Sequence, residues 1–256
     1  MGASMSPQMR PARRSSSDDY QARRAWIAEY FDRTASAAWA QLTSDAPVGR
    51  VRASVRRGRD QMRQTLLSWL PSDMHGATLL DAGCGTGALA IAAAQRGAQV
   101  LAVDLSPTLI NHALERVPSD VARRVTFSSG DMMDPALGTF NYVVAMDSII
   151  HYRQADMQRV LNHFIVCADQ AVLFTVAPRT PLLTTMHTVG RLFPRGDRAP
   201  AIEPVTIPAL CADLDQVDPL WSVRRQSRIS SGFYTSHAIE LARGGGIATD
   251  QEDLFI

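Results

Sequence analysis

The fold is decided by one short stretch of the chain, which reads Leu79-Leu80-Asp81-Ala82-Gly83-Cys84-Gly85-Thr86-Gly87. An apolar strand ends there at an acidic residue, three glycines come next at alternate positions, and a helical segment begins at Ala88. Because glycine has no β-carbon, such a loop can turn tightly and let a ligand approach the bare backbone. The stretch predicts a strand, a loop and a helix, with a ligand at the carboxyl end of the strand.

The spacing of these glycines distinguishes the loop from a dinucleotide-binding fingerprint. That fingerprint, GxGxxG, leaves the N-terminus of a helix open for a pyrophosphate group. This chain has GxGxG directly behind the carboxylate of Asp81. A carboxylate at that place repels a phosphate but attracts a cationic amino-acid group. The loop therefore favours a ligand that carries a sulfonium and an ammonium group.

Three more acidic residues lie at the ends of the next strands of the predicted sheet. Asp104 ends the second strand, 23 positions after Asp81, where a carboxylate can hold a ribose diol. Asp131 comes after the third strand beside the apolar Met132, and Asp147 ends the fourth. One such acid alone is explained equally well by a helix cap or a surface position. Four of them at successive strand ends, on the edge where open α/β sheets bind ligands, indicate one shared site.

The main part of the chain alternates short β-rich runs with helical segments, which is typical of a mostly parallel sheet. An irregular piece, Pro178 to Pro208, holds six of the fourteen prolines and is interpreted as a lid-like insertion after the fifth strand. An antiparallel pair that turns at Ser230 and Ser231 closes the sheet. The expected strands are Thr78–Asp81, Val100–Asp104, Val125–Ser129, Tyr142–Asp147, Ala171–Thr175, Ser222–Ile229 and Gly232–Ala242.

The chain divides into one folded domain, a helical arm and two tails. We expect the domain over residues 76–243 and the arm, which would act as a lid, over residues 18–75. Residues 1–17 are rich in Arg, Ser and Pro and carry no acidic residue, which favours a disordered tail over a transit peptide. Residues 244–256 are expected to form a loose C-terminal tail.

The arm itself shows a helical period of apolar residues, with Tyr30 and Phe31 among them. From Arg50 to Leu70 an apolar stripe that includes Val51 is surrounded by arginines, and Pro71 ends that helix. The arm is therefore predicted to contain two or three amphipathic helices.

The amino-acid composition argues against several classes of protein. The 256 residues include 26 basic and 25 acidic side chains, a net charge of +1, so the chain lacks the basic excess of a dedicated nucleic-acid-binding protein. No apolar run approaches the roughly 18–20 residues that span a membrane. Three widely spaced cysteines fit a reducing, cytoplasmic setting and neither a zinc ribbon nor a disulfide framework. Every basic residue is arginine, which excludes lysine as a catalytic base.

These residues resemble the class I S-adenosylmethionine-dependent methyltransferases, from about Gly76 to Ala177. The resemblance implies an α/β, Rossmann-like fold with a seven-stranded, mostly parallel sheet and helices on both faces. It also implies S-adenosylmethionine as the methyl donor, with no metal bound by the protein itself. The cofactor-binding residues that it implies, together with the strand-end acids, are Asp81, Gly83, Gly85, Gly87, Asp104, Leu105, Asp131, Met132 and Asp147.

The segment after the fourth strand bears on the choice of methyl acceptor. An Asn/Asp-Pro-Pro-Tyr motif would indicate methylation of an amide or nucleobase nitrogen, but this chain has Asp147-Ser148-Ile149-Ile150-His151-Tyr152. With a charge near zero and no lysine, a nucleic acid is a weaker choice than a small molecule. The helical arm and the insertion would then form the pocket for that molecule.

Several longer motifs carry more information than the glycine loop, and they are Tyr30 to Thr34 with Trp39, Arg56 to Arg59, Ala145 to Tyr152, Phe174 to Pro181, Leu192 to Arg195 and Ser230 to Tyr234. They are similar to those of the magnesium-protoporphyrin IX O-methyltransferase family, above all its bacteriochlorophyll-pathway members, over about residues 20–241. The resemblance implies transfer of a methyl group from S-adenosylmethionine to one propionate of Mg-protoporphyrin IX, which gives the monomethyl ester in chlorophyll or bacteriochlorophyll biosynthesis.

The chemistry of that reaction suggests which side chains it needs. A propionic acid with a pKa of about 4.3 is ionised at neutral pH, so positioning and exclusion of water matter more than a strong base. A tight ion pair would lower the nucleophilicity of the substrate carboxylate, so neutral hydrogen-bond donors are expected beside it. The resemblance points to His151 and Tyr30 for this catalytic role. The alternatives are a helix cap for His151 and core packing for Tyr30.

Other residues are candidates for binding the rest of the porphyrin. Arg179, Arg195 and Arg198 are candidate clamps for the second propionate, and plain surface arginines are the alternative. Trp39 belongs to a set of aromatic side chains that suits a flat macrocycle or an ordinary core. His187 is a candidate axial ligand of the porphyrin magnesium, although magnesium prefers oxygen and water serves as well.

Two other interpretations stay open at this point. One is a methyltransferase of the same fold that acts on another small acceptor, such as a quinone-precursor hydroxyl, which would need a base to remove the phenol proton. The other is a non-catalytic scaffold that binds S-adenosylmethionine. The resemblance is also compatible with delivery of the porphyrin by the porphyrin-binding subunit of magnesium chelatase and with peripheral membrane contact. The arginine-rich helix from Arg50 to Arg63 would be the docking face, unless it is merely solvated.

Overall fold

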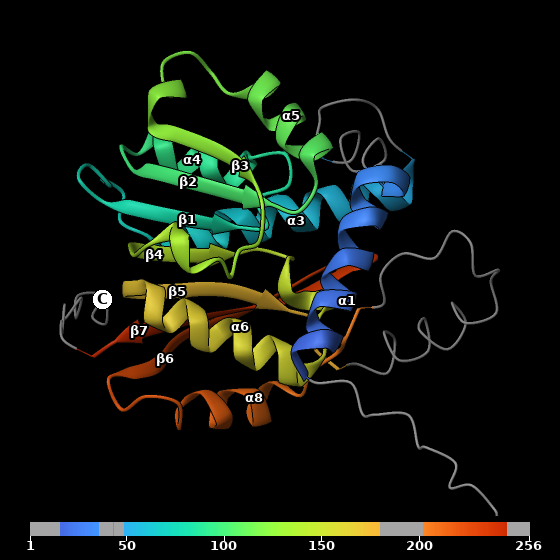
Figure 1. Ribbon diagram of the computed structural model, residues 1–256, viewed down its shortest axis with the longest axis vertical. Coiled ribbons are helices and arrows are strands. Elements are labelled where there is room, and N and C mark those ends of the chain that lie inside the picture. Colours follow the sequence, from blue (N-terminus) through green and yellow to red (C-terminus); the bar gives the residue numbers. More distant parts are fainter. Residues whose placement is uncertain (1–15, 36–42, 44–48, 180–201, 245–256) are drawn as a thin grey trace, which may run out of the picture.

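The structure, a computed structural model, describes residues 16–35, 43, 49–179 and 202–244. Within these ranges seven strands form one sheet in the order β3-β2-β1-β4-β5-β7-β6. Strands β1 to β5 run parallel, and β7 is antiparallel to its neighbours β5 and β6 (Figure 1). The predicted α/β class, with a mostly parallel sheet and helices on both faces, is confirmed.

The sheet and its helices have well-defined bounds. The strands are β1 (Thr78–Ala82), β2 (Gln99–Asp104), β3 (Val125–Ser129), β4 (Phe140–Ala145), β5 (Ala168–Val176), β6 (Trp221–Ser231) and β7 (Tyr234–Arg243). The α-helices are α1 (Ser16–Glu29), α3 (Arg50–Trp69), α4 (Ala88–Gln95), α5 (Pro107–Arg116), α6 (Gln154–Cys167) and α8 (Ile207–Leu214). The shorter turns are the π-helical η1 (Tyr30–Ala35) and the 3-10 helices η2 (Ala122–Arg124), η3 (Pro135–Leu137) and η4 (Ile149–His151).

Two apolar cores lie on the two faces of the sheet. Ile27 of α1, Phe164 of α6 and Leu210 of α8 belong to one of them. Leu66 of α3 and Ala90 of α4 belong to the other. Parallel strands covered on both faces must be apolar along most of their length, as β4 and β5 are. Helix α1 crosses the carboxyl ends of the parallel strands, so the arm covers the edge where the site was predicted (Figure 1).

Two predicted boundaries were wrong for reasons of backbone geometry. Strand β4 ends at Ala145, not at Asp147, because Asp147 has a left-handed backbone (φ 54°) that cannot continue a strand. The β6–β7 hairpin turns at Gly232 and Phe233, two residues after the predicted Ser230 and Ser231. Glycine adopts the positive φ of 58° that this tight turn requires.

The irregular parts also differ from expectation. Helix α8 was not predicted, and it begins at Ile207 inside the supposed insertion, with Pro208 in its first turn. Val51, placed on the apolar stripe of the arm, is 51% exposed. Helix α1 begins at Ser16, two residues before the expected boundary. The tails and residues 180–201 lie outside the described ranges, so the division into arm, insertion and tails stays a prediction.

No helix in the described ranges is long and apolar enough to cross a membrane.

Helix α3 lies unusually close to β7 because of a glycine. A β-carbon added to Gly58 would lie only 2.4 Å from Cδ1 of Tyr234 and 2.8 Å from its Cβ. Both residues are buried, so neither can move into solvent to relieve such a contact. The glycine therefore sets the distance between the arm and the sheet.

We expect Gly58→Ala to lower the free energy of unfolding by about 1–2 kcal/mol, since the overlap with Tyr234 outweighs the higher helix propensity of alanine. Urea denaturation followed by circular dichroism measures the change. Gly49→Ala is the control, because a β-carbon there meets nothing within 4 Å. Equal stability of the Gly58→Ala and wild-type proteins would contradict the close packing.

Candidate functional site

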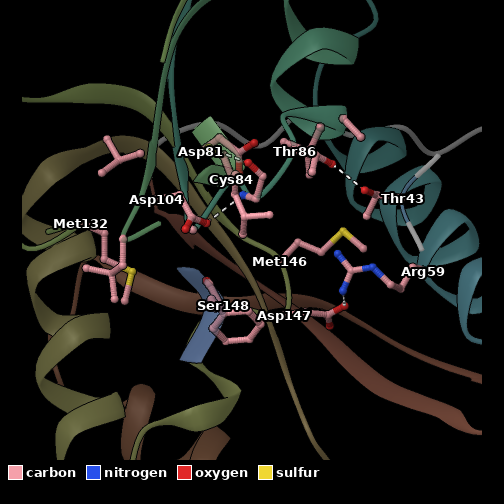
Figure 2. A pocket seen from close by; sticks show the side chains of 18 of the residues that line it. Thr43, Arg59, Asp81, Cys84, Thr86, Asp104, Met132, Met146, Asp147 and Ser148 are labelled. Carbon is pink, nitrogen blue, oxygen red and sulfur yellow. Dashed lines mark hydrogen bonds and ion pairs between the residues drawn. The ribbon is translucent and has the colours of Figure 1, made fainter. Parts of the chain in front are cut away.

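A pocket of about 270 Å³ opens at the carboxyl ends of the parallel strands (Figure 2). Its walls come from the glycine loop after β1, the ends of β2 and β4, the turn after β3, the arm, and one side of α3. The arm residues that line the pocket are Ile27, Phe31 and Thr43, among the arm residues before α3 that the structure describes. The structure thus brings together at one pocket most of the residues that the sequence placed at strand ends.

The glycine loop has the geometry that the sequence predicted. Gly83, Gly85 and Gly87 all have positive φ, between 55° and 82°, which other residues rarely adopt. Behind the loop, the carboxylate of Asp81 is 2% exposed and accepts a hydrogen bond from the Ala90 backbone N–H at 3.1 Å. Burial, with a smaller contribution from the charge of Asp104, raises the pKa of Asp81 to about 7.

Asp104 ties the loop to the next strand. Its carboxylate accepts a hydrogen bond from the backbone N–H of Gly85 at 2.8 Å (Figure 2) and another from that of Ser106 at 2.9 Å. Burial raises the pKa of Asp104, although these bonds oppose the shift. Leu105 lines the pocket beside it. The predicted ribose contact is therefore rigid and lies at the pocket wall.

Asp131 joins the pocket to the arm. Its carboxylate accepts hydrogen bonds from the Tyr20 hydroxyl at 3.1 Å and from the Met133 backbone N–H, and it pairs with Arg24. Burial, together with the charges of Tyr152 and Asp131, raises the pKa of Tyr20. Met132 is buried and lines the pocket next to Asp131. The predicted adenine contact is thus also an anchor for α1, which the sequence did not reveal.

Asp147 has a different environment from the other strand-end acids. Its side chain is 4% exposed and pairs with Arg59 at 2.6 Å (Figure 2). It also accepts hydrogen bonds from the hydroxyls of Thr175, Tyr234 and Ser236, at 3.1–3.3 Å.

Asp147 lines the pocket, and its contact with the cofactor stays a prediction. Both carboxylate oxygens already accept from protein donors, and among the described residues Asp147 is the one non-glycine residue with a positive φ. A strained backbone and a saturated carboxylate indicate a residue that holds its neighbours in place. Its principal neighbour in the pocket is Arg59.

His151 lines the pocket, whereas Tyr30 contacts Phe31, which in turn contacts His151. The His151 ring is 5.5 Å from the Phe31 ring, and Phe31 contacts Tyr30 edge-on at 5.4 Å. His151 and Phe31 line the pocket, whereas Tyr30 is not among the lining residues of the described chain. The catalytic roles of His151 and Tyr30 stay predictions, and the structure favours His151 as the residue nearer to a substrate.

The main chain of His151 is held by the arm. Arg23 donates from Nε to the His151 carbonyl oxygen at 2.9 Å and pairs with Glu203 at 3.0 Å. The Glu203 backbone N–H in turn donates to the Ile150 carbonyl oxygen. Both α1 and the segment before α8 therefore fix the short helix η4 that presents His151.

Ser148 was missed by sequence reasoning. Its hydroxyl is buried in the pocket wall and has no hydrogen-bond partner among the described residues. A β-carbon added to Gly83 would lie 2.2 Å from the Ser148 β-carbon, so the glycine loop and the turn after β4 touch here. A buried hydroxyl without a partner costs about 1–3 kcal/mol, so Ser148 marks a place where a polar ligand group would fit.

The arginines of α3 were also not predicted to line the pocket. Arg56, Arg59 and Arg63 do so, from a helix whose arginines were assigned to a solvated or docking face. Their spacing of three and four residues, which places them on one helical face, was the available signal.

The predicted substrate-binding residues are less well placed or lie outside the described ranges. Arg179 is exposed, does not line the pocket in the described chain, and its backbone N–H donates to Val205. Trp39, His187, Arg195 and Arg198 lie outside the described residues. In the described ranges no three His, Cys, Asp or Glu side chains are arranged to hold a metal ion.

Comparisons with known proteins place this chain among methyltransferases. A family model described as "Magnesium-protoporphyrin IX methyltransferase C-terminus" matches residues 145–243, and one described as "Methyltransferase domain" matches residues 79–168. The chain is 46% identical to the "Magnesium-protoporphyrin O-methyltransferase" of Rhodobacter capsulatus, over 87% of this chain and 97% of that protein. It is 29% identical to the Synechocystis protein of the same name, over 85% and 95% of the two chains.

A solved structure shares this fold over most of the chain. The crystal structure of magnesium protoporphyrin IX methyltransferase (ChlM) from Synechocystis, with bound SAH, superposes with a TM-score of 0.76 at 27% identity. The match covers 86% of this chain and 99% of that chain.

Proposed function

Because the chain belongs to the magnesium-protoporphyrin O-methyltransferase family, we propose that it transfers a methyl group from S-adenosylmethionine to one propionate carboxylate of Mg-protoporphyrin IX. The observation that carries the proposal is the 46% identity across nearly the full length of the Rhodobacter capsulatus enzyme. The products are the monomethyl ester and S-adenosylhomocysteine, and the reaction belongs to chlorophyll or bacteriochlorophyll biosynthesis.

The pocket fits the cofactor. Gly83 and Gly85 line the pocket with bare backbone, and beside Gly83 the buried Ser148 hydroxyl has no hydrogen-bond partner among the described residues. We propose that Asp81 attracts the ammonium group, Asp104 holds the ribose, and Asp131 with Met132 contacts the adenine. When bound, the cofactor supplies a methyl group on a positively charged sulfur, and the O–C bond forms as the C–S bond breaks.

The protein's part in the reaction is positioning. The substrate carboxylate carries no proton to be removed at neutral pH, so no residue has to act as a base. His151 would direct one carboxylate oxygen toward the methyl group, while Phe31 and the rest of the arm would exclude water. The absence of any need for a base separates this proposal from methylation of a phenolic hydroxyl.

The test of the function is incubation of the purified chain with S-adenosylmethionine and either Mg-protoporphyrin IX or metal-free protoporphyrin. We expect mass spectrometry to show a gain of one methyl group on the magnesium compound. If no porphyrin is methylated although calorimetry shows that S-adenosylhomocysteine binds, the proposal is wrong. Other acceptors or a scaffold role would then be the better interpretation.

The raised pKa of Asp81 predicts that cofactor binding depends on pH. At pH 6 the carboxyl is largely protonated, because its pKa is about 7. An incoming ammonium group favours the ionised form, so binding of S-adenosylhomocysteine at pH 6 should release close to one proton, and affinity should rise between pH 6 and pH 8. Without ligand, the raised pKa of Asp81 contributes stability that is fully present below its ordinary pKa and is lost as the pH rises through about 7.

Calorimetry in two buffers with different ionisation enthalpies measures this proton release. The Asp81→Asn variant is the control and should bind more weakly without releasing a proton. Identical binding enthalpies for the wild type in both buffers at pH 6 would show that Asp81 is already ionised.

Location and macromolecular partners are further proposals. We propose a cytoplasmic protein with peripheral contact to the photosynthetic membrane and delivery of the porphyrin by the porphyrin-binding subunit of magnesium chelatase. Arg50, Arg52 and Arg57 support a docking face because they are the exposed arginines near the start of α3.

A further inference from the structure

One face of α3 carries three arginines into the pocket. Arg56, Arg59 and Arg63 line the same pocket as His151 and the glycine loop. Each is partly buried, in contrast to Arg52 and Arg57 of the same helix, which are exposed. The helix therefore divides its arginines between the pocket and the solvent.

The position of this face is fixed by the fold. Gly58 lets α3 approach Tyr234 closely, and the Tyr234 hydroxyl donates to Asp147. Asp147 in turn pairs with Arg59, which points from α3 toward it (Figure 2). On the next turn Arg63 pairs with Asp60 at 2.9 Å. Arg59 and Arg63 therefore each have a carboxylate partner, and together with Arg56 they line the pocket.

The proposed substrate has a matching chemical feature. Mg-protoporphyrin IX carries two propionates on neighbouring pyrrole rings, and only one of them is methylated. The reacting carboxylate must stay nucleophilic, so a guanidinium partner would slow it, but the second carboxylate gains from such a partner. A face of arginines in the same pocket as the His151 imidazole meets both requirements.

We propose that the arginine face of α3, Arg56, Arg59 and Arg63, binds the non-reacting propionate and thereby decides which carboxylate reaches the methyl group. The inference rests on the proposed function and assigns to α3 the task that sequence reasoning gave to Arg179, Arg195 and Arg198. It also explains why the reaction stops after one methyl group. A second transfer would require the new ester to occupy the arginine face, where it offers no charge.

Equilibrium binding tests the proposal without turnover. The full chain, saturated with S-adenosylhomocysteine, is titrated with Mg-protoporphyrin IX, with its enzymatically prepared monomethyl ester and with its dimethyl ester, followed by porphyrin fluorescence. Wild type should bind the first two alike, because both retain the second carboxylate, and the dimethyl ester at least about tenfold more weakly. Arg56→Gln and Arg63→Gln should each weaken the two acids about tenfold and leave the dimethyl ester unchanged.

Arg57→Gln is the matched control, since it removes the same charge from the same helix outside the pocket. Arg59→Gln is unsuitable because it would leave the buried Asp147 carboxylate without its cation. Equal weakening of all three porphyrins, or the same effect from Arg57→Gln, would overturn the proposal. So would a single monomethyl isomer from Arg56→Gln, where we expect a mixture of isomers. A wild-type protein that methylates no porphyrin would instead overturn the proposed function itself.

Discussion

Replacing His151 by alanine should lower kcat with Mg-protoporphyrin IX about 100-fold, the loss expected when a reacting group is displaced by about 1 Å. His151 lines the pocket and is held through its main chain by Arg23 and through its ring by Phe31. Its removal leaves the substrate carboxylate without the group that directs it to the methyl carbon. The affinity for S-adenosylhomocysteine should stay within about twofold, because the predicted cofactor contacts Asp81, Asp104 and Asp131 lie outside η4.

Two further variants separate positioning from packing. His151→Asn keeps a neutral donor and should recover part of the lost turnover, whereas His151→Phe fills the space without a donor and should not. His163→Ala, a half-buried histidine of α6 outside the pocket, is the control. Single-turnover rates with saturating cofactor provide the measurement. If His151→Phe is as active as the wild type, the ring serves only to fill space.

Asp147→Ala should lower the free energy of unfolding by about 3–5 kcal/mol, the cost of leaving one partner of a buried ion pair alone. The substitution removes the acceptor shared by Arg59, Thr175, Tyr234 and Ser236. It also places alanine at a φ of 54°, which Asp and Asn tolerate better. For a chain of this length the loss corresponds to roughly 6–20 °C in Tm.

Thermal unfolding in the presence and absence of S-adenosylhomocysteine tests this expectation. Asp147→Asn tolerates the same backbone and retains one acceptor oxygen, so it should lose less stability while weakening its bond to Arg59. Asp120→Ala, on an exposed turn, is the control and should stay within about 0.5 kcal/mol of the wild type. A Tm of Asp147→Ala within about 2 °C of the wild type would show that this cluster does not hold α3 to the sheet.

The sheet and the glycine loop were predictable because their signals are local. An apolar run ending in Asp81, with glycines at alternate positions, specifies strand, turn and helix within a few residues. The places of Asp104 and Asp131 could be predicted from the rule that parallel strands end at one edge. Boundaries failed where backbone strain decided them, as at Asp147, or where a proline-rich segment concealed the helix α8.

The contacts of the arm residues could not be predicted from local sequence patterns. Arg59 meets Asp147 88 positions later, and Tyr20 meets Asp131 111 positions later. Such pairs depend on how a helix docks on the finished sheet, and local periodicity cannot specify the docking. In the sequence the arginines of α3 therefore match the pattern of a solvated face. The close contact between Gly58 and Tyr234, which sets the orientation of the helix, is visible only in the structure.

The contact of α1 with Asp131 couples two equilibria. The same carboxylate lines the pocket and accepts from Tyr20 and Arg24 of the arm. Thermodynamic linkage requires such an effect to be reciprocal: a ligand that strengthens the docking of α1 is itself bound more tightly, by the same factor, when α1 is docked. Ligand binding in the pocket should therefore increase the protection of the α1 backbone amides from hydrogen exchange, even where α1 does not contact the ligand.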